Sequence, residues 1–193
     1  QKLYRREAEV IHPPVDTAQL SPSGQREDFY LCLGQLVRYK RVDLAVEAFN
    51  RLGLPLVVIG EGECMDDLRK IANENVKFLG RQPFDAVKDH LERCQALVFP
   101  GVEDFGIVPV EAMAAGAPVI AFAGGGALET VIDGETGILF RIQSVESLAD
   151  AVTKLESGEV VFDASRLQNH ARRFDISVFR ESMRKFIEEK LDS

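Results

Sequence analysis

Short apolar runs alternate with amphipathic segments along most of this chain, and this rhythm limits the fold more than any other feature of the sequence. The apolar runs predict strands at residues 29–36, 55–60, 76–80, 96–100, 118–122 and 137–140. Between them, the helical spacing of apolar residues predicts helices at 41–53, 63–74, 84–93, 107–115 and 127–132. Strand and helix in turn, with short connections, predict the α/β class: a Rossmann-like, doubly wound parallel sheet of about six strands.

The two ends of the chain depart from this rhythm. After residue 140 the sequence predicts only helices, at 144–156, 163–173 and 175–190. Residues 1–27 are rich in proline, serine and charged residues, and they contain the turn signals HPPV and SPSG. We therefore expect residues 1–27 to be an interdomain linker or lead-in and residues 28–193 to form one domain.

Charge and cysteine content narrow the class of protein. A net charge of −8 argues against a nonspecific nucleic-acid binder, although it leaves room for a local basic pocket. The three cysteines have no metal-ligand spacing and no CxxC pair, which favours a reducing compartment and small core residues. Residues 107–128 have the length of a membrane span, but Glu111, two prolines and four glycines interrupt them, so we reject that interpretation.

Ligands of doubly wound sheets bind beyond the carboxyl ends of the strands, so the segments after each strand form the candidate site. GQLVRYKR, residues 34–41, places Arg38, Lys40 and Arg41 after the first strand, where cations suit a phosphate group. A solvated basic turn explains the same residues equally well. GEGE, residues 60–63, lacks the spacing of the dinucleotide-binding fingerprint, and taken alone it predicts a tight turn around Glu61.

Two segments offer backbone amides to an anion. AGGGAL, residues 123–128, places three glycines before a short helix, and Phe105, Gly106 and Ile107 lie where another helix begins. The N–H groups at a helix N-terminus make a ready anion site. For the glycine run the alternative is a glycine-rich linker, against which the closely flanking strands argue.

Two glutamates, Glu103 and Glu111, lie eight positions apart in the apolar stretch EDFGIVPVEAMAAGAPVI. Glu111 falls in the first turns of the predicted helix and Glu103 in the loop before it, so both belong to the same end of the sheet. A carboxylate accepts two hydrogen bonds from vicinal hydroxyls, the pattern of a ribose or a pyranose. For Glu103 the alternative is an exposed loop acid; for Glu111 the apolar neighbours argue against such a role.

Four blocks follow one another along the chain: GQLVRYKRVDLAVEAF, VVIGEGE, VKFLGR and FPGVEDFGIVPVEAMAAGAPVIAFAGGGALETVIDGETGILF. Together they resemble the C-terminal half of the retaining GT-B glycosyltransferases, and more narrowly the mannosyltransferase-like group in their family four. The resemblance runs from about residue 10 to the end, and its specific part is Glu-x7-Glu with the GGG…E…DGxTG that follows. Residues 28–193 would then be the nucleotide-sugar-binding half of a GT-B fold, and the N-terminal, acceptor-binding domain would be absent from this chain.

The resemblance implies a role for each candidate residue. Glu103 would hold hydroxyls of the transferred sugar and Lys40 would bind the diphosphate leaving group; these are the two predicted catalytic residues. Glu111 would hold the ribose, and the amides of Phe105, Gly106 and Ile107 would meet the sugar and the diphosphate. The Gly80–Arg81 turn would lie near the base. The remaining members of the predicted nucleotide-sugar site are Gly34, Gln35, Arg38, Gly60 and Glu61.

One position departs from the family pattern. Arginine usually follows the glycine of the first loop, and here that position is Gln35. Glutamine donates a hydrogen bond but brings no charge, so the diphosphate would be held less strongly. Arg38, from the same loop, is our candidate to supply the missing charge.

The resemblance implies transfer of a hexose with retention, with mannose from GDP-mannose as first choice and a UDP-sugar as the other candidate. The acceptor would be a glycan or a lipid-linked molecule, and no metal or other cofactor is expected. The isolated chain would bind a nucleotide sugar weakly and transfer nothing, because the absent domain normally contributes catalytic contacts. We expect a cytoplasmic enzyme that binds no nucleic acid and meets the inner membrane face only through the absent domain.

Two other functions stay open. A nucleotide-sugar epimerase shares the GT-B fold, although such enzymes usually rely on other acids and histidines. A non-catalytic nucleotide-binding module is the second, and Gln35 favours it. Epimerisation without an acceptor would identify the first, and binding without turnover by the full-length protein would identify the second.

Overall fold

Alternate residues of each strand point to opposite faces of the sheet, and both faces are buried except along the edge strand at residues 76–80. In a computed structural model, which describes residues 8–191, the strands are β1 (Tyr30–Leu33), β2 (Leu56–Ile59), β3 (Val76–Gly80), β4 (Leu97–Phe99), β5 (Val119–Phe122) and β6 (Gly137–Phe140). In β5, Val119 and Ala121 enter one apolar cluster while Ile120 enters the other. Burial on both sides explains why the strand sequences other than β3 are apolar throughout, whereas β3, at the edge of the sheet, contains the exposed Lys77.

The strands form one sheet in the order β3-β2-β1-β4-β5-β6, and every neighbouring pair is parallel. The helices that connect them are α1 (Val42–Leu52), α2 (Met65–Ile71), α3 (Phe84–Arg93), α4 (Ile107–Ala114) and α5 (Ala127–Thr130). The order reverses between β1 and β4, which is the switch point of a doubly wound sheet. The predicted fold class is confirmed.

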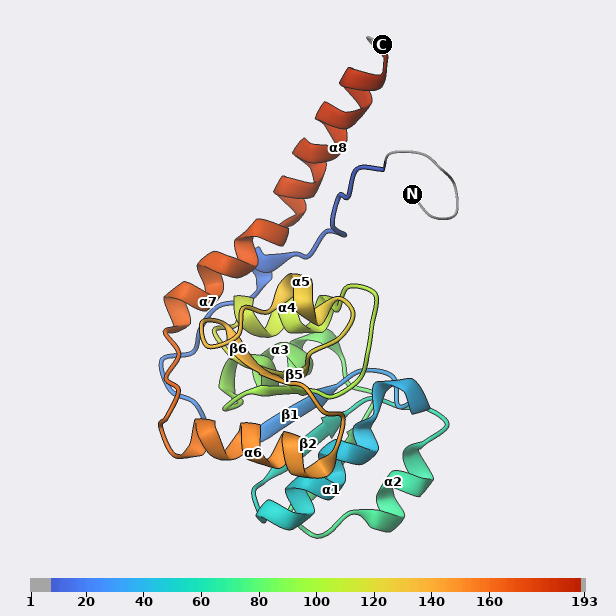
Figure 1. The fold of residues 1–193 in the computed structure, drawn as a ribbon, viewed down its shortest axis with the longest axis vertical. Helices are drawn as coiled ribbons and strands as arrows, with labels where there is room; N and C mark the ends of the chain where they lie inside the picture. The colour runs from blue at the N-terminus through green and yellow to red at the C-terminus, as the bar shows by residue number, and fades with distance from the viewer. Residues whose placement is uncertain (1–7, 192–193) are drawn as a thin grey trace.

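Helices cover the sheet in two layers (Figure 1). One apolar cluster lies against α3, α4 and α7 (Ala164–Ala171), and the other lies against α1 and α6 (Val145–Glu156). The two late helices begin at side-chain caps, because Ser144 accepts a hydrogen bond from the Ser147 amide and Asp163 accepts one from the Arg166 amide. These caps fix where α6 and α7 dock on the sheet.

The lead-in segment packs against the core well before residue 28, where we expected the domain to begin. It contains η1 (Thr17–Gln19), and Val15 and Leu20 are buried in the core. Val15 also forms a parallel bridge with Asp175, next to η3 (Arg172–Phe174). The apolar residues of this segment follow neither helical nor strand periodicity, and the segment is anchored in the core by single apolar side chains. Residues 1–7 lie outside the described part, and a role as an interdomain connection stays a prediction.

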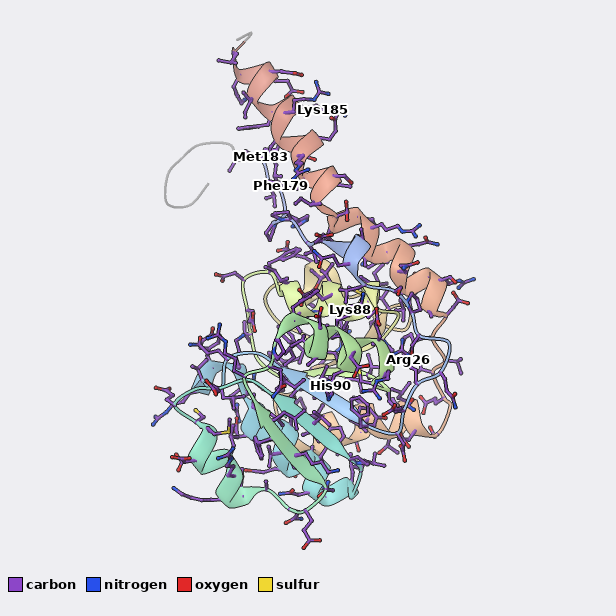
Figure 2. All side chains as sticks on the ribbon, turned by 180° about the vertical axis from the view of Figure 1, so that it is seen from behind. Arg26, Lys88, His90, Phe179, Met183 and Lys185 are labelled. Carbon is purple, nitrogen blue, oxygen red and sulfur yellow. The ribbon has the colours of Figure 1, made fainter. Side chains whose placement is uncertain are left out.

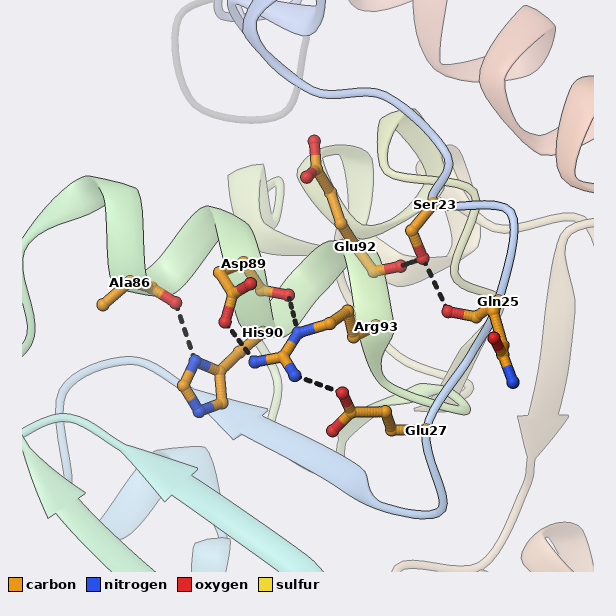
Figure 3. Close-up of polar contacts among 8 residues, drawn as sticks. All are labelled: Ser23, Gln25, Glu27, Ala86, Asp89, His90, Glu92 and Arg93. Atoms are coloured by element: carbon orange, nitrogen blue, oxygen red, sulfur yellow. Dashed lines mark hydrogen bonds and ion pairs between the residues drawn. The ribbon is translucent and has the colours of Figure 1, made fainter.

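Polar contacts hold the rest of the lead-in against the end of α3 (Figure 3). The Ser23 hydroxyl contacts the carbonyl oxygens of Gln25 and Glu92, and Arg93 pairs with Glu27 and with Asp89 of its own helix. Arg26 donates to the carbonyls of the two helix-capping residues Cys94 and Ala115, at 2.6 and 3.2 Å. One partly buried guanidinium therefore closes the C-terminal ends of both α3 and α4.

The edge of the sheet at β6 is closed by the DGETG turn that precedes it. The Leu139 amide donates to Asp133 Oδ1 at 2.9 Å, and the Gly134 amide donates to the Gly137 carbonyl at 2.8 Å. Backbone groups that would otherwise face outward are thereby satisfied within the chain. The DGxTG part of the motif thus has a structural role.

The last helix, α8 (Ile176–Leu191), extends away from the body of the molecule (Figures 1 and 2). No residue in this span is buried, and Phe179 and Met183 are only partly covered. Arg184 pairs with Glu181 one turn away, as the charge pattern of the helix predicts. Within residues 8–191 no helix has both the length and the apolar character needed to cross a membrane.

Candidate functional site

The carboxyl ends of β1 and β4 enclose a small hollow at the switch point of the sheet, where ligands of such folds bind. Its walls come from the segments 32–36 and 98–101 together with Lys40, Val42 and Glu103. The free space is about 20 Å³, room for roughly one water molecule. This hollow is therefore the floor of a site rather than a space that encloses a nucleotide sugar.

Lys40 and Glu103 meet across this floor. Lys40 Nζ lies 2.9 Å from Glu103 Oε1, and only 18% and 22% of the two side chains are exposed. Oε1 is buried and receives no hydrogen bond of normal geometry from residues 8–191, so the ammonium is its charge partner. Lys40 is the last residue of η2 (Arg38–Lys40), and glycine at position 101 leaves room for its backbone. Two residues far apart in sequence thus form one ion pair at the switch point.

The predicted residues Gly34, Gly60 and Gly80 form a row along the ends of β1, β2 and β3. The Gly34 amide donates to Ile59, and the Gly60 amide donates to Gly80. A Cβ atom at Gly60 would lie 1.8 Å from the Gly34 carbonyl oxygen, so the absence of a side chain serves backbone packing here. This packing accounts for the glycine at position 60, and its place in the nucleotide-sugar site stays a prediction.

Glu61 and Arg81 lie at the same end of the sheet, beyond β2 and β3. Both are exposed, and Glu61 Oε1 lies 3.6 Å from the position that a Cβ of Gly80 would take. The Glu61 side chain therefore reaches over the Gly80–Arg81 turn. Its carboxylate and the Arg81 guanidinium are both open to a ligand on this side of the site.

The backbone from Phe105 to Ile107 enters α4 with its amides unused. Within residues 8–191, none of the N–H groups of Phe105, Gly106 and Ile107 donates to a protein acceptor. The glycine run behaves differently from its predicted role, because the Gly126 amide donates to the Glu103 carbonyl at 2.7 Å. It holds the Glu103 loop in place, and the three unused amides at the start of α4 are the better anion site.

Glu111 lies one turn into α4 and is largely covered. Its carboxylate has no hydrogen bond or ion pair to any residue of the range 8–191. Burial raises the pKa of the Glu111 carboxyl, because the charged form loses hydration without gaining a partner. An unpartnered carboxylate of this kind is suited to accept hydrogen bonds from a ligand.

Gln35 lines the floor of the site, but Arg38 does not. Arg38 lines a separate hollow of about 430 Å³ together with Arg41, Asp67 and Leu68, between η2, α1 and α2. The structure therefore does not bring Arg38 to the Lys40–Glu103 pair. Whether Arg38 compensates for Gln35 is a question of binding and stays untested.

Gln143 is a site neighbour that the sequence interpretation missed. Its Nε2 donates to the Pro100 carbonyl at 2.8 Å, and its Oε1 accepts from Arg41 at 3.3 Å. It thereby ties the segments after β1, β4 and β6 together. The signal was available, since Gln143 lies just beyond a predicted strand, at the end where ligands bind.

Metal-ligating side chains do not gather in the part of the chain that the structure describes. No group of three or more His, Cys, Asp or Glu residues in residues 8–191 is placed to hold a metal ion. Cys32, Cys64 and Cys94 are free thiols, two of them buried. The expectation that the chemistry needs no metal stays a prediction.

Comparison with known proteins agrees with this geometry. Residues 18–174 match the family model described as glycosyl transferases group 1. An uncharacterized glycosyltransferase of Methanocaldococcus jannaschii is 32% identical over 160 residues, which cover 80% of this chain and 45% of that protein. The GDP-mannose-dependent alpha-(1-6)-phosphatidylinositol monomannoside mannosyltransferase of Mycobacterium tuberculosis is 34% identical over 178 residues, covering 76% and 46%. The chain spans about half the length of these relatives.

Among solved structures, the chain is similar in fold to HepE of Anabaena, determined in complex with UDP and glucose. The TM-score is 0.82 at 22% identity, and the match covers 93% of this chain and 56% of that one. At this level of identity the similarity establishes the fold alone.

Proposed function

Because this chain belongs to the group 1 glycosyl transferases, we propose that it is the nucleotide-sugar-binding domain of a retaining hexosyltransferase. The observation that carries the proposal is the Lys40–Glu103 ion pair at the switch point, followed in the same loop by three unused amides. A cation, a carboxylate and free N–H groups at one place are the complement of a sugar diphosphate.

The positive groups act on the diphosphate. When the bond between the sugar and the diphosphate breaks, negative charge grows on the leaving phosphate oxygens. Lys40 and the amides of Phe105, Gly106 and Ile107 stabilise that charge, and as fixed groups they need little reorganisation during the reaction. Gln35 adds a hydrogen bond from the side of β1 but no charge.

The carboxylates act on hydroxyls. Glu103 accepts hydrogen bonds from the transferred sugar, and Glu111 accepts them from the ribose. Among residues 8–191 the Glu111 carboxylate has no hydrogen-bond or ion-pair partner, which supports this assignment. Glu61 and the Gly80–Arg81 turn lie on the side of β2 and β3, where the base is expected.

GDP-mannose is our first choice of sugar donor, and the mycobacterial relative whose name specifies GDP-mannose supports it. A UDP-sugar is the alternative, supported by the Anabaena structure that contains UDP. The acceptor, a glycan or a lipid-linked molecule, would meet an acceptor-binding domain on the other side of the site. We place the reaction in the cytoplasm, and this chain alone binds the donor weakly and transfers nothing.

A thermal-shift screen of GDP-, UDP- and ADP-sugars on the chain tests the proposal. A ligand at a hundred times its dissociation constant should stabilise the chain by about 2.7 kcal/mol. Lys40→Ala should abolish the shift. Lys88→Ala removes a lysine that is ion-paired with Glu92 in α3, and it should preserve the shift. No shift with any of these nucleotide sugars at millimolar concentration would overturn the proposal.

A further inference from the structure

We propose that His12 is a positioning residue for the amide loop, by which we mean Phe105, Gly106 and Ile107. The inference rests on the proposed function, because it assumes that these amides meet the diphosphate. His12 comes from the lead-in segment, nearly a hundred residues away in sequence. The contacts that connect it to the loop are contacts between rings.

Three rings pack together behind the amide loop. The His12 ring stacks on Phe105 with 5.4 Å between centroids and 28° between planes. Phe174 meets both of them edge-on, at 5.4 Å from His12 and 5.5 Å from Phe105. Phe174 is itself held by His170, whose ring lies 5.7 Å away and whose Nε2 contacts the Thr130 carbonyl at 2.8 Å. Phe105 thus has a ring on two sides.

The glycine run holds the amide loop through its backbone. The Gly126 amide donates to the Glu103 carbonyl, and a Cβ at Gly126 would lie 2.3 Å from the Phe105 Cα atom. The loop is therefore held by the glycine run through its main chain and by the ring of His12 through the Phe105 side chain. Removing the His12 ring leaves the edge-on contact of Phe174 with Phe105 and the main-chain contacts, but no stacked ring.

Glu129, the glutamate of the GGG…E…DGxTG motif, lies beside His12. Its Oε2 lies 3.5 Å from His12 Nδ1, and both side chains are partly exposed, 52% and 37%. A pair with this exposure contributes little by itself. The pair orients the imidazole against Phe105, and the stacking of the two rings fixes the position of Phe105.

Positioning matters because unused amides stabilise an anion only when they already point at it. If His12 is truncated, Phe105 gains freedom and the amides of the loop no longer have one fixed direction. Binding of a nucleoside diphosphate should then weaken. Binding of the bare nucleoside should not, because the base and the ribose use Glu111 and the far side of the site.

The test compares His12→Ala, His12→Phe and the matched control His90→Ala. His90 also has a ring contact, with Phe29 at 5.8 Å, but it belongs to α3 and meets the residue before β1, at the amino end of that strand (Figures 2 and 3). GDP, UDP and guanosine are titrated into each variant. ¹H–¹⁵N spectra report the amides of Phe105, Gly106 and Ile107 in the ligand-free chain.

We expect His12→Ala to weaken nucleoside diphosphate binding about three- to tenfold, the size that one aromatic pair contributes. Guanosine binding should not change, His12→Phe should restore the affinity, and the three amide signals should shift or broaden only in His12→Ala. Equal loss in His12→Ala and His90→Ala, or unchanged binding and unchanged amide signals in His12→Ala, would overturn the inference. If the wild-type chain bound neither GDP nor UDP, the proposed function would fail, and the amide signals alone would still decide whether His12 positions the loop.

Discussion

Glu103→Gln should change the affinities for a bare nucleoside diphosphate and for a nucleotide sugar in opposite directions. In the ligand-free chain Lys40 is paired with Glu103 at 2.9 Å, so a diphosphate has to compete with this carboxylate for the ammonium. Glutamine removes the competitor but also removes the charge that accepts hydrogen bonds from the sugar. The first effect favours both ligands, and the second weakens only the ligand that carries the sugar.

The magnitudes follow from the exposure of the pair. The two side chains are only 18% and 22% exposed, so the pair belongs at the upper end of the about 1 kcal/mol that solvent-accessible ion pairs contribute, and the bare diphosphate should bind about fivefold more tightly. Hydrogen bonds to a charged group contribute about 1.5–3 kcal/mol, so the preference for the nucleotide sugar over the diphosphate should fall about tenfold to a hundredfold. For the nucleotide sugar the loss of these hydrogen bonds exceeds the gain from removing the competing carboxylate, so its affinity should fall.

Isothermal titration of GDP and GDP-mannose into wild type and variant measures both affinities. Glu181→Gln is the matched control, because it removes the same charge from an ion pair of the same 2.9 Å length on α8. It should leave both affinities unchanged. The reasoning would be refuted if Glu103→Gln shifted both ligands by the same factor in the same direction.

Four other substitutions test separate parts of the account. Glu111→Gln should raise the midpoint of thermal unfolding near pH 7, because burial raises the pKa of this carboxyl and its ionisation therefore favours the unfolded chain. The same variant should weaken nucleotide binding, because it removes the charged acceptor. In the wild type the carboxylate is protonated already above pH 4.5, so the affinity should fall on acidification in that range, and titrations at several pH values check this. Gln35→Arg should tighten diphosphate binding about fivefold by adding a charge-assisted hydrogen bond. Arg38→Ala should leave diphosphate binding unchanged, since Arg38 lines a separate hollow. Loss of binding in Arg38→Ala, measured by calorimetry, would contradict the placement of Arg38 outside the diphosphate site. Arg26→Ala should lower the free energy of unfolding by about 1–3 kcal/mol, because two carbonyls lose their donor. Urea denaturation measures this change, and a stability equal to wild type would contradict a role of Arg26 in capping both α3 and α4.

The sequence predicts the sheet well, because burial on both faces leaves a local signal. Each predicted strand contains an observed one, and the predicted helix at 84–93 coincides with α3. The lead-in left no such signal. Val15 and Leu20 are isolated among polar and proline residues, and only the tertiary structure shows that they enter the core.

The site was predictable to the extent that topology decides it. Segments that follow parallel strands must meet at one edge, so Lys40, Glu103 and the start of α4 could be placed together from the sequence. Which groups pair across that edge depends on tertiary distances. The Lys40–Glu103 pair, the position of Arg38 outside the floor and the bridge made by Gln143 all follow from packing that no local pattern records.

Glycine was the residue type whose role was hardest to predict. A glycine after a strand suits a close approach by a ligand or by another part of the backbone, and the sequence does not distinguish the two. At Gly60 and Gly126 the neighbour is backbone, at 1.8 Å from the Gly34 oxygen and 2.3 Å from Phe105 Cα for an added Cβ. The glycine run therefore shapes the site indirectly, by holding the loop that carries Glu103 and the amides.

The most direct test of the central claim is a crystal structure of this chain with the nucleoside diphosphate of its best-binding nucleotide sugar. We expect the diphosphate between Lys40 Nζ and the amides of Phe105, Gly106 and Ile107, with the ribose hydroxyls on the Glu111 carboxylate. A nucleotide bound elsewhere, for example in the hollow of Arg38 and Asp67, with the Lys40–Glu103 pair intact, would contradict the claim.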